Sequence, residues 1–277
     1  MISIENLHFA YSKNRVFNGI STHLQPGHIY GILGKNGTGK STLLHIISGL
    51  LFPTEGTITV MGFTPGKRQP SFLRDIFMVP EEFHLPNISI ADYIGLNGPF
   101  YPKFNRQQFF DYVQGFGIPE HSTLQAMSYG QKKKVLISFG LATNVSLLLM
   151  DEPGNGLDIV SKGQLRKMIV GAADEHKCIL ISSHQVKDLE NLIDEVLIID
   201  DTRILLKQSL ETIAAKLSFK ISFDPTDLVG ALYSEPLLRG NTVVTPNTEG
   251  EESNIDLEIL YKAAMADPEK MQAIMMD

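Results

Sequence analysis

The stretch GKNGTGKS, residues 34–41, has the spacing G-x-x-x-x-G-K-[ST] of a phosphate-binding loop. Glycines let backbone N–H groups turn inward around phosphate oxygens, and a helix beginning near Lys40 points its positive end at the same anion. Lys40 is placed to reach the β- and γ-phosphates, and Ser41 to coordinate Mg²⁺. The loop lies between an apolar strand and an apolar helix, so an empty glycine-rich turn is a weak alternative. We expect phosphate to be bound by Gly34, Lys35, Asn36, Gly37, Thr38, Gly39, Lys40 and Ser41.

Two acidic residues, Asp151 and Glu152, follow the apolar run LLLM. A carboxylate at the end of a buried strand can hold Mg²⁺ through water, and the next carboxylate can polarise an attacking water. Alone, such a pair is more often a solvated strand end, but downstream of a phosphate loop it indicates hydrolysis. His184 ends the segment CILISSH, where a neutral donor would face the terminal phosphate, although a lone histidine is more often structural. We expect Glu152 and His184 to be catalytic and Asp151 to be a metal ligand with Ser41.

A sheet must position these groups. Short apolar segments alternate with amphipathic ones, which predicts a mainly parallel sheet covered on both faces by helices. Pro26-Gly27 predicts a turn between two strands of a hairpin-rich edge. Strands are expected at residues 2–11, 28–34, 56–62, 74–80, 145–153, 178–184, 195–200 and 203–207, and helices at 41–50 and 161–177.

Residues from 87 to about 145 have a helical pattern that interrupts this alternation. Ser89 and Asp92 are spaced as a capping pair for one helix, and residues 105–117 predict a second. We therefore expect a helical lobe distinct from the sheet. The octet MSYGQKKK, residues 127–134, lies in this lobe and combines a hydroxyl, a glycine and an amide with three lysines.

Composition limits the class of protein. The 277 residues carry a formal charge of −7, of which residues 1–206 contribute −1 and residues 207–277 contribute −6. An acidic C-terminal segment argues against nucleic acid as a partner and marks a boundary near Lys207. The only cysteine, Cys178, is expected to be a core residue in a reducing cytoplasm. We expect no signal peptide, and no apolar run approaches the roughly 20 residues of a membrane helix.

The order of the motifs resembles that of the ATP-binding subunits of ABC transporters. The resemblance covers about residues 1–206 and rests on the phosphate loop, Ser128-Tyr129-Gly130-Gln131 in the signature position, LLLMDEP, GNGLD and the switch position. It implies a P-loop (Walker A) ATPase that binds ATP and Mg²⁺. Three further site residues come from it: Thr42 for ATP, Tyr11 as an aromatic stacked on adenine, and Asp158 in the D-loop.

The resemblance also implies an α/β fold with a mainly parallel core, an antiparallel β edge subdomain, a helical subdomain at about 87–145, and a small C-terminal α+β appendage. The ATPase domain would span residues 1–206 and an accessory segment residues 207–277. Within the accessory segment, residues 219–224 and 240–246 could be strands, residues 255–275 are expected to be helical, and residues 247–254 an exposed loop.

In this family two subunits pack head to tail, so the signature would serve the nucleotide of the partner. Ser128, Gly130 and Gln131 would then complete the γ-phosphate site of a second copy, and a helix beginning near Ser128 would point its positive end there. Lysines 132–134 would add positive potential, although at least two of them could simply form a solvated helix face.

Two departures from the family pattern stand out. Met127 and Tyr129 replace the commonest Leu and Gly of the signature, while the residues expected to contact phosphate are kept. Glu81 stands in the Q-loop position, where the family usually has glutamine. A carboxylate there can still be a ligand of Mg²⁺ but adds negative charge near the triphosphate, so affinity or turnover could change.

The resemblance implies ATP hydrolysis that drives transport through a separate transmembrane permease, with the chain at the cytoplasmic face of the membrane. The C-terminal segment favours export, because similar tails occur in single-domain exporter ATPases. The alternative is a soluble ABC ATPase with a role in assembly or regulation. A nucleic-acid-associated member would need long coiled-coil insertions or a second ATPase domain, and neither is present in the sequence. In this family the membrane partner selects the substrate.

Overall fold

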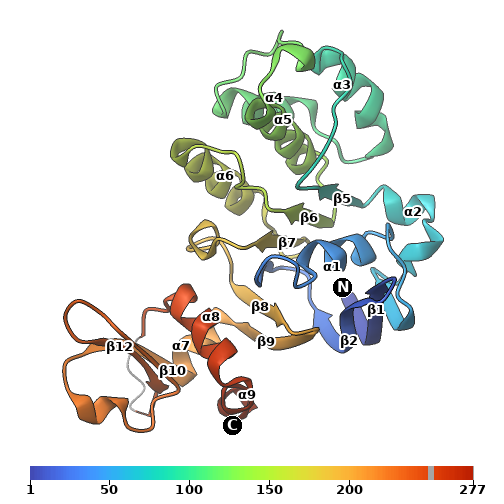
Figure 1. Ribbon diagram of the computed structural model, residues 1–277. Helices are drawn as coiled ribbons and strands as arrows, with labels where there is room; N and C mark the ends of the chain where they lie inside the picture. Colours follow the sequence, from blue (N-terminus) through green and yellow to red (C-terminus); the bar gives the residue numbers. More distant parts are fainter. Residues whose placement is uncertain (249–252, 277) are drawn as a thin grey trace.

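The computed structural model describes residues 1–248 and 253–276. Its centre is a six-stranded sheet in the order β5-β6-β7-β3-β8-β9, in which five strands are parallel and β9 is an antiparallel edge (Figure 1). Every residue of β3, β6 and β7 is buried, as expected for parallel strands covered on both faces. The six strands are β3 (Ile29–Leu33), β5 (Ile76–Val79), β6 (Leu147–Asp151), β7 (Cys178–Ser183), β8 (Glu195–Asp200) and β9 (Arg203–Ser209).

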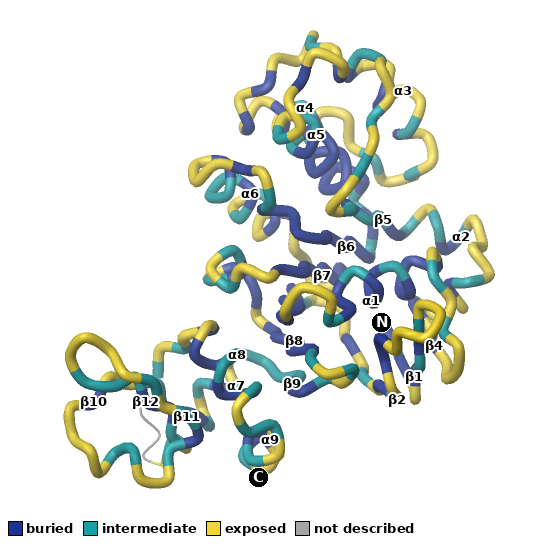
Figure 2. Tube along the Cα trace, viewed as in Figure 1, coloured by how far each residue is buried: buried dark blue, intermediate teal, exposed yellow. Residues whose placement is uncertain are grey.

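The two faces of this sheet contribute to different hydrophobic clusters. Along β6, Leu147 and Leu149 pack toward a second, antiparallel sheet of order β2-β1-β4 and the helix α1, whereas Leu148 and Met150 pack toward helices on the opposite face. Successive strand residues point to opposite sides, so one short apolar run fills both clusters. Figure 2 shows these strands as the buried centre of the molecule. The antiparallel sheet and the helices on its side are β1 (Ile2–Tyr11), β2 (Asn14–Leu24), α1 (Lys40–Ile47), β4 (Glu55–Val60) and the short α2 (Pro70–Leu73).

A helical lobe lies beyond β5, at the top of Figure 1. Its interior is aromatic: the Phe139 ring lies within 6.4 Å of the rings of Phe77, Tyr93, Tyr101, Phe104 and Phe109. Helix α6 begins after the end of β6 and contacts α5 of the lobe. The helices are α3 (Ile90–Asn97), α4 (Arg106–Gly115), α5 (Tyr129–Ala142) and α6 (Ile159–Ala172).

The C-terminal segment forms a small antiparallel sheet of order β10-β12-β11, at the lower left of Figure 1. Its helix α8 packs on β8 and β9, and the buried α8 residues Leu257, Leu260 and Ala264 belong to the same hydrophobic cluster as Val196 and Ile198 of β8. The segment therefore shares its core with the central sheet. Its elements are α7 (Leu210–Lys216), β10 (Leu217–Ser222), β11 (Tyr233–Pro236), β12 (Asn241–Pro246), α8 (Leu257–Ala266) and α9 (Pro268–Met276).

The predicted α/β class with a mainly parallel sheet is confirmed, but several details differ. The turn at residues 26–27 joins strands of two different sheets, not a hairpin. The helix expected to reach residue 177 ends at Ala172, and the one expected over residues 255–275 is broken at Asp267, before Pro268. Strand β9 runs to Ser209, past the boundary expected after residue 206. Residues 249–252 of the expected loop lie outside the described residues.

None of the helices within the described ranges combines the length and apolar character needed to span a bilayer.

Candidate active site

The loop at residues 34–41 connects β3 to α1 at the carboxyl edge of the parallel sheet. Gly39 has φ 104°, and a Cβ there would lie 2.6 Å from Val16 and 2.8 Å from Phe17. A Cβ on Gly34 would lie 2.5 Å from the Thr38 hydroxyl oxygen. Only glycine fits both positions, so the backbone N–H groups of the loop can face a bound anion.

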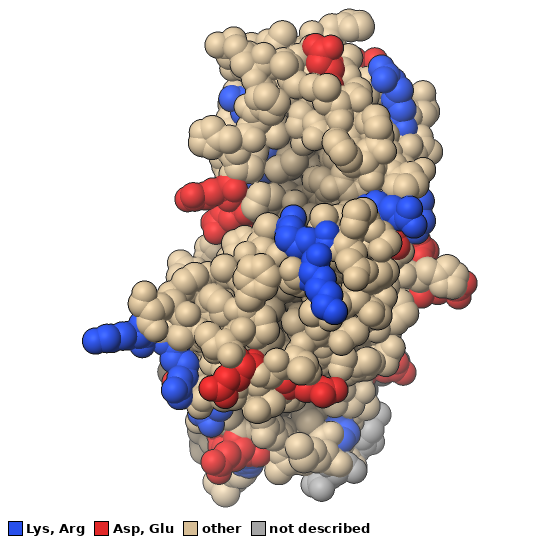
Figure 3. All heavy atoms as spheres, turned by 90° about the vertical axis from the view of Figure 1, so that its right-hand side faces the viewer, with Lys and Arg blue, Asp and Glu red and all other residues tan. Residues whose placement is uncertain are grey.

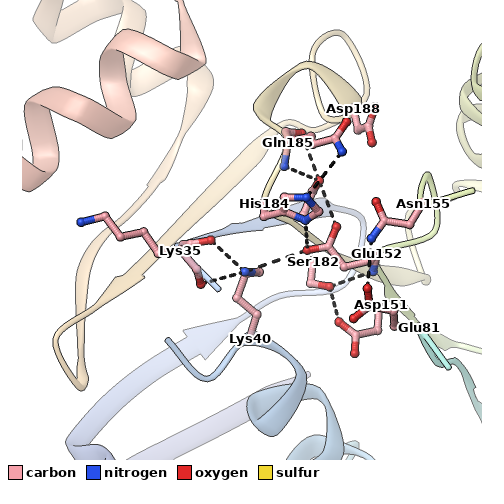
Figure 4. A network of polar contacts seen from close by, with 12 residues as sticks. Lys35, Lys40, Glu81, Asp151, Glu152, Asn155, Ser182, His184, Gln185 and Asp188 are labelled. Carbon is pink, nitrogen blue, oxygen red and sulfur yellow. Dashed lines mark hydrogen bonds and ion pairs between the residues drawn. The ribbon is translucent and has the colours of Figure 1, made fainter. Parts of the chain in front are cut away.

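Lys40 is the buried cation of this loop, with 6% of its side chain exposed. Its Nζ donates to the carbonyl oxygens of Gly34 at 2.8 Å and Lys35 at 3.1 Å, and lies 3.9 Å from Glu152 Oε1. Burial lowers the pKa of Lys40, while the carboxylates of Glu152, Asp151 and Glu81 oppose that shift. In Figure 4 the Lys35 side chain points away from Lys40, so Lys35 contributes its backbone to this site.

The two carboxylates at the end of β6 are both buried. The Ser182 hydroxyl donates a hydrogen bond to Asp151 Oδ1 at 2.5 Å. Ser182 Oγ also accepts a hydrogen bond from the backbone N–H of Glu152 at 3.0 Å. Glu152 has φ 46°, a left-handed conformation that is costly for a residue with a side chain. His184 Nδ1 lies 2.9 Å from Glu152 Oε1, so the residues following β6 and β7 meet directly (Figure 4).

A cleft of about 410 Å³ opens over these groups. Tyr11 is at its rim with 47% of the residue exposed, and the Tyr11 hydroxyl lies 3.4 Å from Thr42 Oγ1. Asp151 lies behind Glu152 and does not line the cleft. The lining residues are Tyr11, Asn14, Val16, Asn36, Gly37, Gly39, Lys40, Ser41, Thr42, Glu81, Glu152 and His184.

The signature residues are placed outside this cleft. Ser128 is the N-cap of α5 and forms a capping box with Gln131: the Gln131 amide donates to Ser128 Oγ at 3.3 Å, and the Ser128 amide donates to Gln131 Oε1 at 3.0 Å. A Cβ on Gly130 would lie 2.9 Å from the Gly156 carbonyl oxygen. The start of α5 therefore abuts the segment GNGLD of the same chain, and its cap residues do not line the cleft of their own subunit.

Asp158 begins α6, where its carboxylate accepts from the amide and hydroxyl of Ser161 at 2.9 and 2.7 Å. These two hydrogen bonds lower the pKa of Asp158 to about 2, with a smaller contribution from Lys134, whose Nζ lies 3.5 Å away. The side chain is a helix cap and does not line the cleft.

The lysine run of the octet is not a uniform charged face. Lys133 is fully buried and donates from Nζ to the Glu152 carbonyl oxygen at 2.6 Å. Burial lowers the pKa of Lys133, against the attraction of Glu81, Glu152 and Asp151. Lys133 therefore stabilises the strained backbone of Glu152. The run of three lysines in the sequence does not indicate this role.

Three other contacts to the site were missed by sequence reasoning. Ser182 holds Asp151 and the Glu152 amide, and the two serines of CILISSH were the signal for it. Asn155 Nδ2 donates to Glu81 Oε1 at 3.0 Å. From α8, Tyr261 lines a 90 Å³ cavity with Gly34, Lys35 and His184.

The sequence profile of the ABC transporter family matches residues 17–155, half of the chain. The lantibiotic transport ATP-binding protein SrtF of Streptococcus pyogenes is 30% identical over 220 residues, which are 76% of this chain and 92% of SrtF. This chain belongs to the ABC transporter family. It is an ATP-binding subunit of that family, and its reaction is ATP hydrolysis.

The share of this ABC subunit that is matched differs from one relative to the next. The ABC transporter ATP-binding protein YtrB of Bacillus subtilis (strain 168) is 27% identical over 271 residues, which are 95% of this chain and 92% of YtrB. The fold is also that of a solved ATP-binding cassette, MJ0796, described as a dimeric post-hydrolysis state bound to ADP and Pi. That likeness has a TM-score of 0.67 at 20% identity and covers 76% of this chain and all but 1% of the other.

Proposed function

We propose that this ABC subunit binds Mg²⁺-ATP in the 410 Å³ cleft and hydrolyses it in a head-to-tail homodimer, and that hydrolysis drives transport through a separate membrane subunit. The observation that carries the proposal is the convergence of Lys40, Glu152 and His184 at one edge of the sheet: Lys40 Nζ lies 3.9 Å and His184 Nδ1 lies 2.9 Å from Glu152 Oε1. The proposed domain division is the ATPase domain expected over residues 1–206, extended to Ser209 so that it holds all of β9, and an accessory segment over the rest of residues 207–277.

In this proposal the glycine loop and Lys40 hold the phosphates, and Tyr11 stacks on the adenine. Glu152 orients and polarises the water whose oxygen attacks the γ-phosphorus as the bond to the bridging oxygen breaks. His184 fixes the Glu152 carboxylate through their 2.9 Å contact and faces the terminal phosphate. Lys133 supports the same residue from the backbone side.

The donor set fits Mg²⁺. The Ser41 hydroxyl and the Glu81 carboxylate line the cleft and supply the hard oxygen ligands that Mg²⁺ prefers, and Asp151, behind Glu152, would hold the ion through water. Within the described part of the chain, no group of three His, Cys, Asp or Glu side chains forms a metal cage. When bound, the ion would neutralise charge on the triphosphate.

The proposed dimer is supported by the position of the signature residues outside the ATP cleft of their own subunit. Ser128 caps a 14-residue helix, and neither Ser128 nor Gly130 lines the chain's own cleft, so the positive end of this helix is available to a phosphate of a second subunit. Exposed apolar side chains lie nearby at the start of α6, where Ile159 is 89% and Val160 71% exposed, beside the D-loop residue Asp158. A second copy would cover them and supply a γ-phosphate to Ser128.

A groove of about 660 Å³ between the sheet and the helical lobe supports a permease partner. Leu50 and Phe100 line it with 53% and 72% of each residue exposed, and Arg68 and Arg74 border it. Figure 3 shows basic side chains gathered at mid-height on the face to the right of Figure 1, below the lobe. An apolar groove with a basic border suits a short amphipathic segment of a membrane protein, which would hold this subunit at the cytoplasmic face. We further propose export, because similar C-terminal tails occur in single-domain exporter ATPases and because a relative that is 27% identical over 210 residues is named a Nod factor export ATP-binding protein.

The dimer is tested by trapping it. Glu152→Gln should block hydrolysis and give an ATP-dependent dimer in size-exclusion chromatography with light scattering. Adding Ser128→Arg should abolish that dimer while monomer affinity for a fluorescent ATP analogue stays within about threefold, because Lys40 and the loop are untouched. Ser209→Arg is the matched control, since Ser209 caps α7 away from the signature. A trapped dimer that survives Ser128→Arg, or a folded monomer that loses ATP binding, would refute the head-to-tail arrangement.

The permease contact is tested in native membranes. Leu50→Asp with Phe100→Asp should release the subunit into the supernatant after membranes are pelleted. Leu238→Asp is the control, because Leu238 is exposed and apolar but lies in the turn between β11 and β12. Equal release by both variants, or by neither, would count against the groove.

A further inference from the structure

Glu81 is held at both ends by residues from two other segments. The Tyr129 hydroxyl donates to the Glu81 backbone carbonyl oxygen at 2.5 Å, and Asn155 Nδ2 donates to Glu81 Oε1 at 3.0 Å. The Tyr129 ring also stacks on Phe83, with ring centres 5.0 Å apart and planes inclined by 27°. Residues 81–83 are therefore clamped between the start of α5 and the GNGLD segment.

The clamp acts on a residue of the ATP cleft. Glu81 lines the cleft, and its charge reaches two buried lysines: it acts to raise the pKa of Lys40 and of Lys133 against their burial. An unheld carboxylate at this rim could turn toward Lys40 and compete with phosphate for that cation. Asn155 engages one carboxylate oxygen and leaves the other for the cleft.

The clamp also reaches the signature. Tyr129 stands between Ser128 and Gly130, the residues assigned to the partner's nucleotide, and Gly130 approaches the Gly156 carbonyl so closely that a Cβ would lie 2.9 Å from it. Tyr129 and Asn155 therefore connect three segments of one chain: the strand end after β5, the start of α5 and the GNGLD turn. A shift of Glu81 on metal–nucleotide binding must move at least one of them, because the contacts are direct.

We propose that Tyr129 and Asn155 are positioning residues: they orient Glu81 toward the metal–triphosphate in the chain's own cleft and link that cleft to the signature that serves the partner's cleft. The inference rests on the proposed function. It requires specific atoms, since the Tyr129 hydroxyl is the donor to the Glu81 carbonyl and the Asn155 side-chain amide is the donor to the Glu81 carboxylate.

The first test exchanges donor and acceptor. Asn155→Asp sets two carboxylates against each other, and we expect kcat to fall at least about tenfold and the Mg²⁺ concentration for half-maximal rate to rise, with a smaller change in ATP affinity. Asn155→Asp with Glu81→Gln restores a hydrogen bond with its direction reversed and should recover most of the Tm loss of Asn155→Asp, measured without nucleotide or metal. A double variant no more stable than Asn155→Asp would overturn the clamp.

The second test removes one hydroxyl. Tyr129→Phe keeps the stack on Phe83 but frees the Glu81 carbonyl, so hydrogen exchange of the segment around Glu81 should rise about tenfold or more. We expect the Hill coefficient for ATP hydrolysis to fall toward 1 while monomer ATP affinity stays within about twofold, because the link between clefts is weakened. Tyr112→Phe is the matched control, since the Tyr112 hydroxyl is bound by Gln108 within the helical lobe. Equal effects of both variants on exchange and cooperativity would overturn the link.

The two levels of the proposal can fail separately. If the native chain hydrolyses ATP and forms the trapped dimer, but the donor–acceptor exchange and Tyr129→Phe behave as their controls, only the positioning role is refuted. If the native chain forms no ATP-dependent dimer, the head-to-tail function fails, and with it the link between clefts. The exchange experiment on nucleotide-free protein would still decide the contact between Asn155 and Glu81.

Discussion

His184 Nδ1 and Glu152 Oε1 lie 2.9 Å apart, and this contact joins the ends of two neighbouring parallel strands. The carboxylate is buried, whereas a third of the His184 side chain is exposed toward the cleft. The carboxylate therefore has a fixed direction, set by a residue that can itself contact substrate.

This contact predicts unequal losses of turnover. Glu152→Gln should lower kcat by at least about 100-fold, because an amide cannot polarise water, and His184→Ala by at least about tenfold, because the carboxylate loses its partner. ATP affinity should change little in either. Phosphate release and titration with a fluorescent ATP analogue check this. His28→Ala removes a similar pair with Asp194, 2.7 Å apart and away from the cleft, and should leave kcat unchanged. Equal losses at both histidines would contradict the assignment.

A buried lysine, Lys133, beside a partly buried one, Lys132, offers a test of stability. Lys133→Met keeps the side-chain length but leaves the Glu152 carbonyl without its donor, so the free energy of unfolding should fall by about 1.5–3 kcal/mol. Lys132→Met changes a less buried neighbour and should stay within about 0.5 kcal/mol. Urea unfolding followed by circular dichroism measures both. The role of Lys133 would be wrong if the two variants were equally stable.

The two glycines of the phosphate loop with positive φ should differ in their tolerance of alanine. At Gly37, φ is 83° with open space around the site, so Gly37→Ala should cost only about 1–2 kcal/mol of backbone strain. Gly39→Ala adds overlap with Val16 and Phe17, which should cost a further 1–3 kcal/mol or so. Thermal unfolding without nucleotide separates these effects from ATP binding, and equal Tm values would argue against the tight packing of Gly39.

The cap of α6 should make stability depend on pH in acid. The pKa of Asp158 falls from 3.8 to about 2 on folding, so the ionised carboxylate stabilises the folded state above about pH 4 and this contribution is lost as pH falls toward 2. Asp158→Ser keeps a capping oxygen but does not titrate. The Tm of the native chain minus that of Asp158→Ser should shrink between pH 4 and pH 2. A constant difference would mean that the carboxylate does not titrate with folding.

The motifs and the sheet class could be predicted because each depends on residues that lie close together in the sequence. The spacing from Gly34 to Ser41 and the apolar run before Asp151 each place chemistry at the end of a strand, and parallel strands bring such ends to one edge. Ser128 was expected to begin a helix, and it does, with a complete capping box.

What could not be predicted depends on long-range packing. Three consecutive lysines look like a solvated face, and only the approach of α5 to β6 shows that Lys133 is buried. The turn at residues 26–27 gives no sign that its strands join different sheets, because pairing partners lie far away in the sequence. The helix end at Ala172 is fixed by Lys177, whose Nζ donates to the Ala172 carbonyl from five residues away.

Helix α8 fills the same hydrophobic cluster as β8 and α6, yet it follows them by many residues along the chain. During synthesis, the ATPase core therefore emerges from the ribosome with one flank of its sheet uncovered. That flank includes Ile198 and Leu206, and it is covered only after Leu260 and Ala263 have been made. Until α8 has been made, that flank stays exposed as an apolar surface, and the cavity beside Gly34 and Lys35 of the phosphate loop lacks the side that Tyr261 provides.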